Sequence, residues 1–176
     1  MKKLAILLLS LIMVFIISGC GNEPQYTASS TKLIKNSASF TLDQLMFQIE
    51  GQEQRNEVKP ESPIGYYNYY KHHEGYYYHV VYGTITNKSS EQFYTKSLTV
   101  EAVGENETYE SQFVLINSVN SDFWKDMAPN EELSYLLFSI VPEGKPAPTE
   151  YRIYYNDGFK EGEENTFDFC VRLLLS

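Results

Sequence analysis

The stretch Leu133-Ser134-Tyr135-Leu136-Leu137-Phe138-Ser139-Ile140-Val141 is the most apolar strand-like run that follows residue 40 of this chain. Successive side chains of a β-strand point to opposite faces of a sheet. Here Leu136, Phe138 and Ile140 would share one face and Leu137 and Val141 the other, so both faces are apolar. A run of this kind predicts a central strand that is covered by protein on both of its sides.

Further β-favouring runs lie before and after this stretch. They cover residues 40–50, 64–70, 76–86, 92–103, 109–116, 150–156 and 166–175. Five residues ending in Gly75 separate the second run from the third, which is the length of a hairpin connection. Turn residues recur about every ten positions and no long helical period is present, so the sequence predicts an all-β sandwich or small barrel of about eight strands.

Residues 1–19 have the layout of a secretory signal peptide. Lys2 and Lys3 give a cationic start, and residues 4–17 form an apolar run that contains one polar side chain, Ser10. As a helix this run would be roughly 21 Å long, which is shorter than the roughly 30 Å hydrocarbon core of a bilayer. We therefore expect a cleaved signal peptide rather than a permanent membrane span.

Ile17, Ser18 and Gly19 directly precede Cys20. This arrangement resembles the lipobox of bacterial lipoproteins, in which an aliphatic residue and two small residues precede the modified cysteine. The resemblance implies cleavage before Cys20 and transfer of a diacylglyceryl group to its thiol. Two or more acyl chains would hold the protein stably on the extracytoplasmic face of the cell membrane. The alternative is an ordinary signal peptide that is cleaved nearby and releases a free secreted protein.

Residues 20–39 are polar and lack a sustained apolar period, which predicts a flexible tether, with the sandwich spanning residues 40–176. The whole chain has a formal charge of −9, and removing Lys2 and Lys3 with the signal peptide brings it to −11. An acidic surface repels phosphate backbones and anionic headgroups, so we expect no nucleic-acid partner. With Cys20 acylated, only Cys170 remains, and no internal disulfide can form.

Three runs of sequence, residues 77–89, 127–132 and 137–143, follow one pattern of turn residues and apolar spacing. The pattern resembles the immunoglobulin-like domains of unknown function that many Gram-positive surface lipoproteins carry, which are related to a family of immunoprotective extracellular antigens. Asn130 stands where that pattern has a glycine. The resemblance covers residues 76–155 and implies an antiparallel immunoglobulin-like sandwich outside a Gram-positive cell. It transfers no catalytic residues, because that family has no established ones.

Eight of the fifteen tyrosines lie between residues 66 and 82. A two-stranded ribbon there would present tyrosines on both faces, and a sandwich buries only one of them. We therefore expect exposed rings that contact an envelope protein or a glycan. The candidate binding residues in this segment are Tyr66, Tyr67, Tyr69 and Tyr70. The alternative is that the rings form cross-strand pairs that only stabilise a hairpin.

Trp124 is the only tryptophan and lies in an irregular segment, residues 117–132. A loop-borne tryptophan serves either as a binding anchor or as a plug at one end of a sandwich. We keep Trp124 as a further candidate binding residue.

The sequence predicts no metal ligands, no cofactor and no catalytic residues. His72, His73 and His79 fall close together, but neighbouring strand residues face opposite ways and no cysteine or carboxylate completes a ligand set. The acidic residues between positions 157 and 164 lack the spacing of a calcium loop. There is no Gly-x-Ser-x-Gly elbow and no glycine-rich phosphate loop.

These patterns predict a lipid-anchored extracytoplasmic lipoprotein that acts as a non-catalytic binding or accessory module at the cell envelope. Three alternatives stay open. They are a glycan-binding module that uses exposed tyrosines, an envelope hydrolase whose residues converge from several loops, and a structural spacer without a ligand. A contiguous exposed aromatic patch would argue against the spacer.

Overall fold

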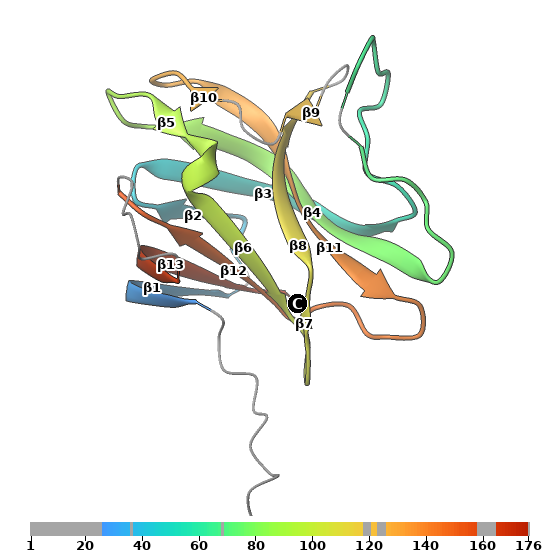
Figure 1. The fold of residues 1–176 in the computed structure, drawn as a ribbon. Helices are drawn as coiled ribbons and strands as arrows, with labels where there is room; N and C mark the ends of the chain where they lie inside the picture. Colours follow the sequence, from blue (N-terminus) through green and yellow to red (C-terminus); the bar gives the residue numbers. More distant parts are fainter. Residues whose placement is uncertain are drawn as a thin grey trace, which may run out of the picture.

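The computed structural model of the chain describes residues 26–35, 37–67, 69–117, 121–122, 126–157 and 165–175, which form two facing β-sheets (Figure 1). The five-stranded sheet contains, in spatial order, β1 (Thr27–Lys35), β13 (Thr166–Leu174), β12 (Glu150–Tyr155), β6 (Leu98–Val103) and β7 (Thr108–Tyr109). The six-stranded sheet contains β2 (Ser39–Leu42), β3 (Leu45–Arg55), β4 (Tyr76–Asn87), β11 (Glu132–Pro142), β8 (Ser111–Ile116) and β9 (Ser121–Asp122). A small third sheet pairs β5 (Phe93–Tyr94) with β10 (Asp126–Met127), and η2 (Thr95–Ser97) is a short 3-10 helix. The predicted all-β sandwich is confirmed.

Strand β11 lies in the middle of the six-stranded sheet, as its apolar sequence predicts. It pairs with β4 on one side and with β8 on the other. Leu137 and Val141 pack into the core between the two sheets, whereas Leu136 and Phe138 belong to a separate buried cluster on the outer face. Both faces of β11 are therefore covered by protein.

The core between the sheets is built from alternate residues of the facing strands. On β8, Phe113 and Leu115 point inward, and on β12 the inward residues are Tyr151, Ile153 and Tyr155. The inward residues of each strand are two positions apart, as the period of a β-strand requires, whereas Val114 of β8 and Tyr154 of β12 are buried on the opposite faces of their sheets. Because aromatic rings bury large apolar areas, they supply much of the free energy that favours this core.

Strand β1 corrects the prediction of a flexible tether that reaches to residue 39. Residues 27–35 pair in parallel register with β13 along its whole length, from Thr27 opposite Thr166 to Lys35 opposite Leu174. Of the strand's side chains only Ile34 is buried, so its sequence has no apolar period to reveal it. Main-chain hydrogen bonds to β13 hold β1 in place. The sandwich thus begins well before residue 40 and is not wholly antiparallel.

The predicted hairpin between residues 64–70 and 76–86 is also wrong. Both edges of β4 are already occupied, because β3 pairs with it as far as Tyr78 and β11 pairs with it as far as Tyr76. No edge is left for a further strand. Residues 56–75 instead run beside the outer face of the six-stranded sheet, on the right of Figure 1, where Val58 and Tyr70 join the buried outer cluster.

Candidate functional site

The segment that carries the predicted tyrosines forms a loop with a closed base. The backbone N–H of Val58 donates a hydrogen bond to the carbonyl oxygen of Tyr70 at 3.0 Å, and the N–H of Tyr70 donates to that of Val58 at 2.9 Å. These two bonds make an isolated antiparallel bridge. We call residues 59–69 the aromatic loop; within it, residue 68 lies outside the described part of the chain.

Tyr70 fastens the base of the aromatic loop to the sheet. Its ring packs edge-on against Phe138, with 4.8 Å between centroids, and against Tyr78, with 6.0 Å. The Tyr78 hydroxyl donates a hydrogen bond of 2.7 Å to the carbonyl oxygen of Lys71, just after the loop. Burial, with a smaller effect of the Glu110 carboxylate, raises the pKa of both tyrosines, so their hydroxyls stay protonated. Of the four predicted contact tyrosines, Tyr70 is therefore an anchor.

The tip of the aromatic loop presents large side chains to solvent. Tyr66 is 92% exposed, Ile64 is 74% exposed and Tyr69 is 41% exposed. Gly65, between the first two, has φ +74°, a left-handed conformation that a residue with a Cβ rarely adopts. The half-buried Tyr67 lies against Tyr69, with 5.4 Å between ring centroids. The tip thus combines two rings that lie against each other with two freely accessible side chains.

This combination suits a contact surface better than a structural turn. Large apolar side chains that cluster in contact with water are unfavourable for solubility. Clusters of this kind therefore mark interaction sites. Tyrosine offers a wide apolar ring with a polar tip and has few torsions to immobilise. A cation is also close, since the Lys71 ammonium lies 5.9 Å from the centroid of the Tyr69 ring. The loop can therefore contact either a protein surface or a sugar ring.

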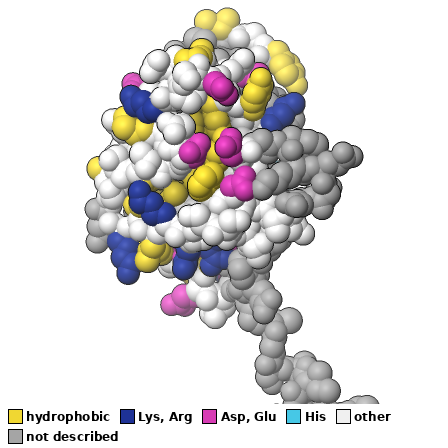
Figure 2. Space-filling model, turned by 90° about the vertical axis from the view of Figure 1, so that its left-hand side faces the viewer, with side chains coloured by type: hydrophobic (Ala, Val, Ile, Leu, Met, Phe, Trp, Pro, Cys, Tyr) yellow, Lys and Arg dark blue, Asp and Glu magenta, His cyan; other side chains and the backbone are white. Residues whose placement is uncertain are grey.

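A second feature, a groove of about 1000 Å³, opens at the end of the sandwich where the turn after β2, the loop after β4 and the end of β12 meet. Figure 2 shows this side of the molecule, with hydrophobic side chains in the middle and acidic side chains beside them. Its aromatic lining residues are Phe93, Tyr94, Tyr155 and Phe167. Sequence reasoning missed this site because four distant segments build it.

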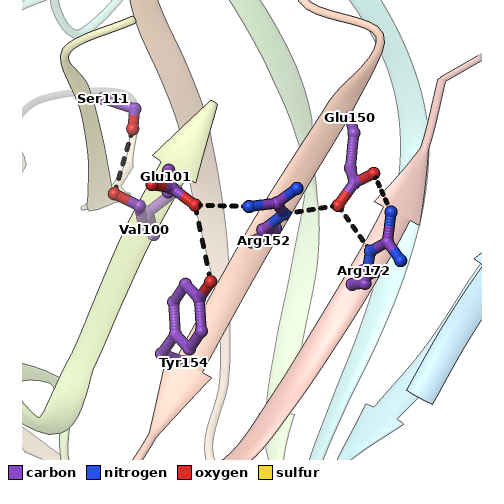
Figure 3. A network of polar contacts seen from close by, with 7 residues as sticks. All are labelled: Val100, Glu101, Ser111, Glu150, Arg152, Tyr154 and Arg172. Carbon is purple, nitrogen blue, oxygen red and sulfur yellow. Dashed lines mark hydrogen bonds and ion pairs between the residues drawn. The ribbon is translucent and has the colours of Figure 1, made fainter. Parts of the chain in front are cut away.

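The outer face of the five-stranded sheet carries a network of paired charges (Figure 3). Arg152 contacts Glu150 at 2.7 Å and Glu101 at 3.0 Å, and Arg172 contacts Glu150 at 2.6 Å. Burial alone would raise the pKa of Glu150, but the hydrogen bonds from Arg172 and Arg152 hold it below its usual value. The network links β6, β12 and β13, and its charges satisfy one another. We assign it a structural role.

Cys170 lies beside that network and is buried. Burial raises the pKa of its thiol to about 11, so the reactive thiolate is scarce at neutral pH.

A polar cluster of His79, Ser139 and Tyr151 lies inside the sandwich. The Tyr151 hydroxyl donates to the carbonyl oxygen of His79 at 2.9 Å, and it lies 3.0 Å from the Ser139 hydroxyl and 3.2 Å from Nδ1 of His79. Burial lowers the pKa of His79. Ser139 and Tyr151 have no exposed surface, so no substrate reaches this cluster. It resembles a catalytic arrangement in residue types alone.

His72 and His73, unlike His79, are exposed between the aromatic loop and β4. Among the residues that the structure describes, no three His, Cys, Asp or Glu side chains lie close enough together to hold a metal ion. In the same part of the chain, no helix has the length and apolar character needed to cross a bilayer. Cys20, Trp124 and the acidic residues 161–164 lie outside the described residues.

No known protein family and no curated protein matches the chain. An uncharacterised β-sandwich protein of Clostridium difficile superimposes with a TM-score of 0.59 and 15% identity, over 88% of this chain and 100% of its own. A conserved hypothetical protein of Bacillus anthracis superimposes with a TM-score of 0.43 and 17% identity, over 72% of this chain and 92% of its own. A Bacillus subtilis protein provisionally described as a lipoprotein superimposes with a TM-score of 0.42 and 10% identity, over 81% of this chain and 39% of its own. At such identities, the likeness to the Clostridium difficile protein shows a shared fold alone.

Proposed function

We propose that this protein is a lipoprotein of a Gram-positive cell membrane, that it has no catalytic activity, and that the aromatic loop binds a protein of the cell envelope. The observation that carries the proposal is the tip of the loop, where Ile64 and Tyr66 are largely exposed on a base fixed by Tyr70. A loop held at its base loses less conformational freedom when it binds than a free segment would.

The anchor in this proposal is the lipid on Cys20. Thr27, the first residue of β1, follows Cys20 by seven positions, and an extended chain of that length spans at most roughly 25 Å. The sandwich would therefore stay close to the membrane, because β1 takes up nine of the twenty residues that the sequence assigned to a tether.

The test is chemical crosslinking of the lipidated protein on living cells, followed by mass spectrometry. The first variant carries Tyr66→Ser, Tyr67→Ser and Tyr69→Ser and keeps the anchor Tyr70. A matched control carries Tyr76→Ser, which removes an exposed tyrosine outside the loop. We expect the parent and the control to capture one defined protein through crosslinks in residues 59–71, and the loop variant to lose it.

Equal capture by all three proteins would contradict the proposal and favour a structural spacer. Capture of a cell-wall glycan in place of a protein, again lost only in the loop variant, would keep the loop as the contact surface and change the class of partner. The same material permits an assay for hydrolysis of wall polymers. Hydrolysis of a wall polymer by the parent protein would overturn the proposal that the protein has no catalytic activity.

A further inference from the structure

We propose that the groove at the other end of the sandwich is a second binding site, for an uncharged oligosaccharide of two or three sugar rings. Strands β5 and β13, which contribute lining residues to the groove, lie on the left of Figure 1, whereas the aromatic loop lies on the right. This site is independent of the proposed function of that loop. Its volume of about 1000 Å³ is at the upper end of the range of about 300–1000 Å³ that is usual for small-ligand sites.

One wall of the groove is fixed by the fully buried side chain of Asn87. Its amide nitrogen donates to the carbonyl oxygens of Glu91 at 2.8 Å and Ala128 at 3.2 Å, and its amide oxygen accepts from the N–H of Ser89 at 3.0 Å. The N–H of Lys88 donates to the carbonyl oxygen of Gln44 at 2.9 Å, which joins this loop to the β2–β3 turn. The walls are thus in place before any ligand binds, which lowers the entropy cost of binding.

The floor and rim of the groove present aromatic rings. Phe93 and Tyr155 lie against each other, with 5.5 Å between ring centroids, and both are nearly buried. Tyr94, the next residue along β5, lines the same groove and is 57% exposed. A sugar ring has an apolar face of C–H bonds, and an accessible tyrosine ring on the rim gives that face a platform to stack on.

The remaining lining is rich in short polar side chains that can bond sugar hydroxyls. They include Gln44, Ser90, Gln92 and Thr99, whereas the side chains of Ser89 and Asn156 are held in hydrogen bonds within the protein. The Tyr155 hydroxyl is a further donor, because burial, with smaller effects of the Asp157, Asp43 and Asp168 carboxylates, raises its pKa to about 12. Hydroxyl and amide groups both donate and accept, as the many hydroxyls of a sugar require.

The charges of the lining argue for an uncharged ligand. The lining contains three acidic residues, Asp43, Glu91 and Asp157, and two lysines, Lys88 and Lys96. A phosphate-bearing or polyanionic ligand would meet repulsion from the acids, and a polycation would meet it from the lysines. An extended peptide fits the groove less well, because the lining offers rings and short polar groups. It lacks the row of apolar pockets that would take the alternate side chains of a peptide strand.

Isothermal titration with two neutral trisaccharides, cellotriose and triacetylchitotriose, tests this inference. The protein is the full chain in a detergent that lacks a sugar headgroup, so that the detergent does not compete. We expect at least one trisaccharide to bind, and Tyr94→Ala to weaken the binding about tenfold, which corresponds to about 1.4 kcal/mol. Tyr94→Phe, which keeps the ring, should bind like the parent. Tyr66→Ala, in the aromatic loop, is the matched control and should leave the affinity unchanged.

Two results would overturn the inference. The first is no heat of binding for either sugar at a concentration of about 10 mM, tenfold above a Kd of about 1 mM that already represents weak binding. The second is binding that Tyr94→Ala leaves intact or that Tyr66→Ala abolishes, since the sugar would then lie elsewhere. Because neither outcome depends on a protein partner of the aromatic loop, the two sites succeed or fail separately.

Discussion

The ring of Tyr70 packs edge-on against the ring of Phe138, at 4.8 Å between centroids and 70° between planes. Phe138 is fully buried on β11, so the contact joins the base of the aromatic loop to the centre of the six-stranded sheet. Four residues before Tyr70, the side chain of Tyr66 is almost wholly in solvent. One short segment therefore contains both a structural anchor and an accessible contact residue.

This division of roles predicts different stabilities for two tyrosine variants. Tyr70→Ala should lower the free energy of unfolding by about 2–3 kcal/mol, because it leaves a cavity against Phe138 and Tyr78. Tyr66→Ala should change it by less than about 0.5 kcal/mol. Urea denaturation of both variants gives these values. Equal losses in the two would mean that Tyr66 also packs against the fold.

Strand β1 gives a second pair of variants on adjacent residues. Ile34 is 8% exposed and belongs to the main core, whereas Leu33 is 46% exposed. Ile34→Ala should therefore cost about 2–3 kcal/mol of stability, and Leu33→Ala less than about 0.5 kcal/mol. Amide hydrogen exchange of residues 27–35 checks the same point, since paired strand residues are protected. Fast exchange along the whole strand would show that β1 is a tether after all.

Sequence patterns identified the parts of this fold in which burial follows a simple period. The central position of β11 follows from the apolar residues on both of its faces. Strand β1 has no such period, because its partner holds it through the backbone and only Ile34 is buried. Residues 64–70 have the composition of a strand, but β3 and β11 already occupy both edges of β4. Which edges are free is a property of the whole sheet, and no local pattern reports it.

The two candidate sites were predictable to different degrees, because a local sequence pattern does not report which distant segments meet in the fold. The density of tyrosines pointed to the aromatic loop, and the pattern could not separate the anchor Tyr70 from the exposed Tyr66. The groove was not predictable, because Asp43, Tyr94 and Asn156 come together only when both sheets have formed. Its polar residues are ordinary turn residues in the linear sequence.

His79 predicts how stability depends on pH. Burial lowers the pKa of this side chain in the folded protein, whereas in the unfolded chain it titrates near about 6.5. Below that pH the unfolded state binds the proton more readily, so stability should fall as pH decreases from about 6.5. Above it, both states hold a neutral imidazole and the slope should vanish. His79→Gln should remove the part of the slope that begins at about pH 6.5 in urea denaturation; an unchanged slope there would assign it to other groups.

Cys20 predicts how the chain is held at the membrane. Cys20→Ala should abolish metabolic labelling with a fatty-acid probe and leave unprocessed precursor, because both modification and cleavage depend on that residue. Cys170→Ala is the matched control, since this buried thiol has no part in the anchor, and it should label like the parent. Undiminished labelling of Cys20→Ala would rule out this anchor.

The central claim, that the tip of the aromatic loop is occupied by a partner in the cell, is tested most directly by tyrosine footprinting. Oxidative labelling would be compared between living cells that display the lipidated protein and the purified protein. Tyr76, which is exposed outside the loop, serves as the internal reference. We predict that Tyr66 and Tyr69 are protected in cells while Tyr76 is labelled equally in both samples. Equal labelling of Tyr66 and Tyr69 in cells and in the purified protein would contradict the account.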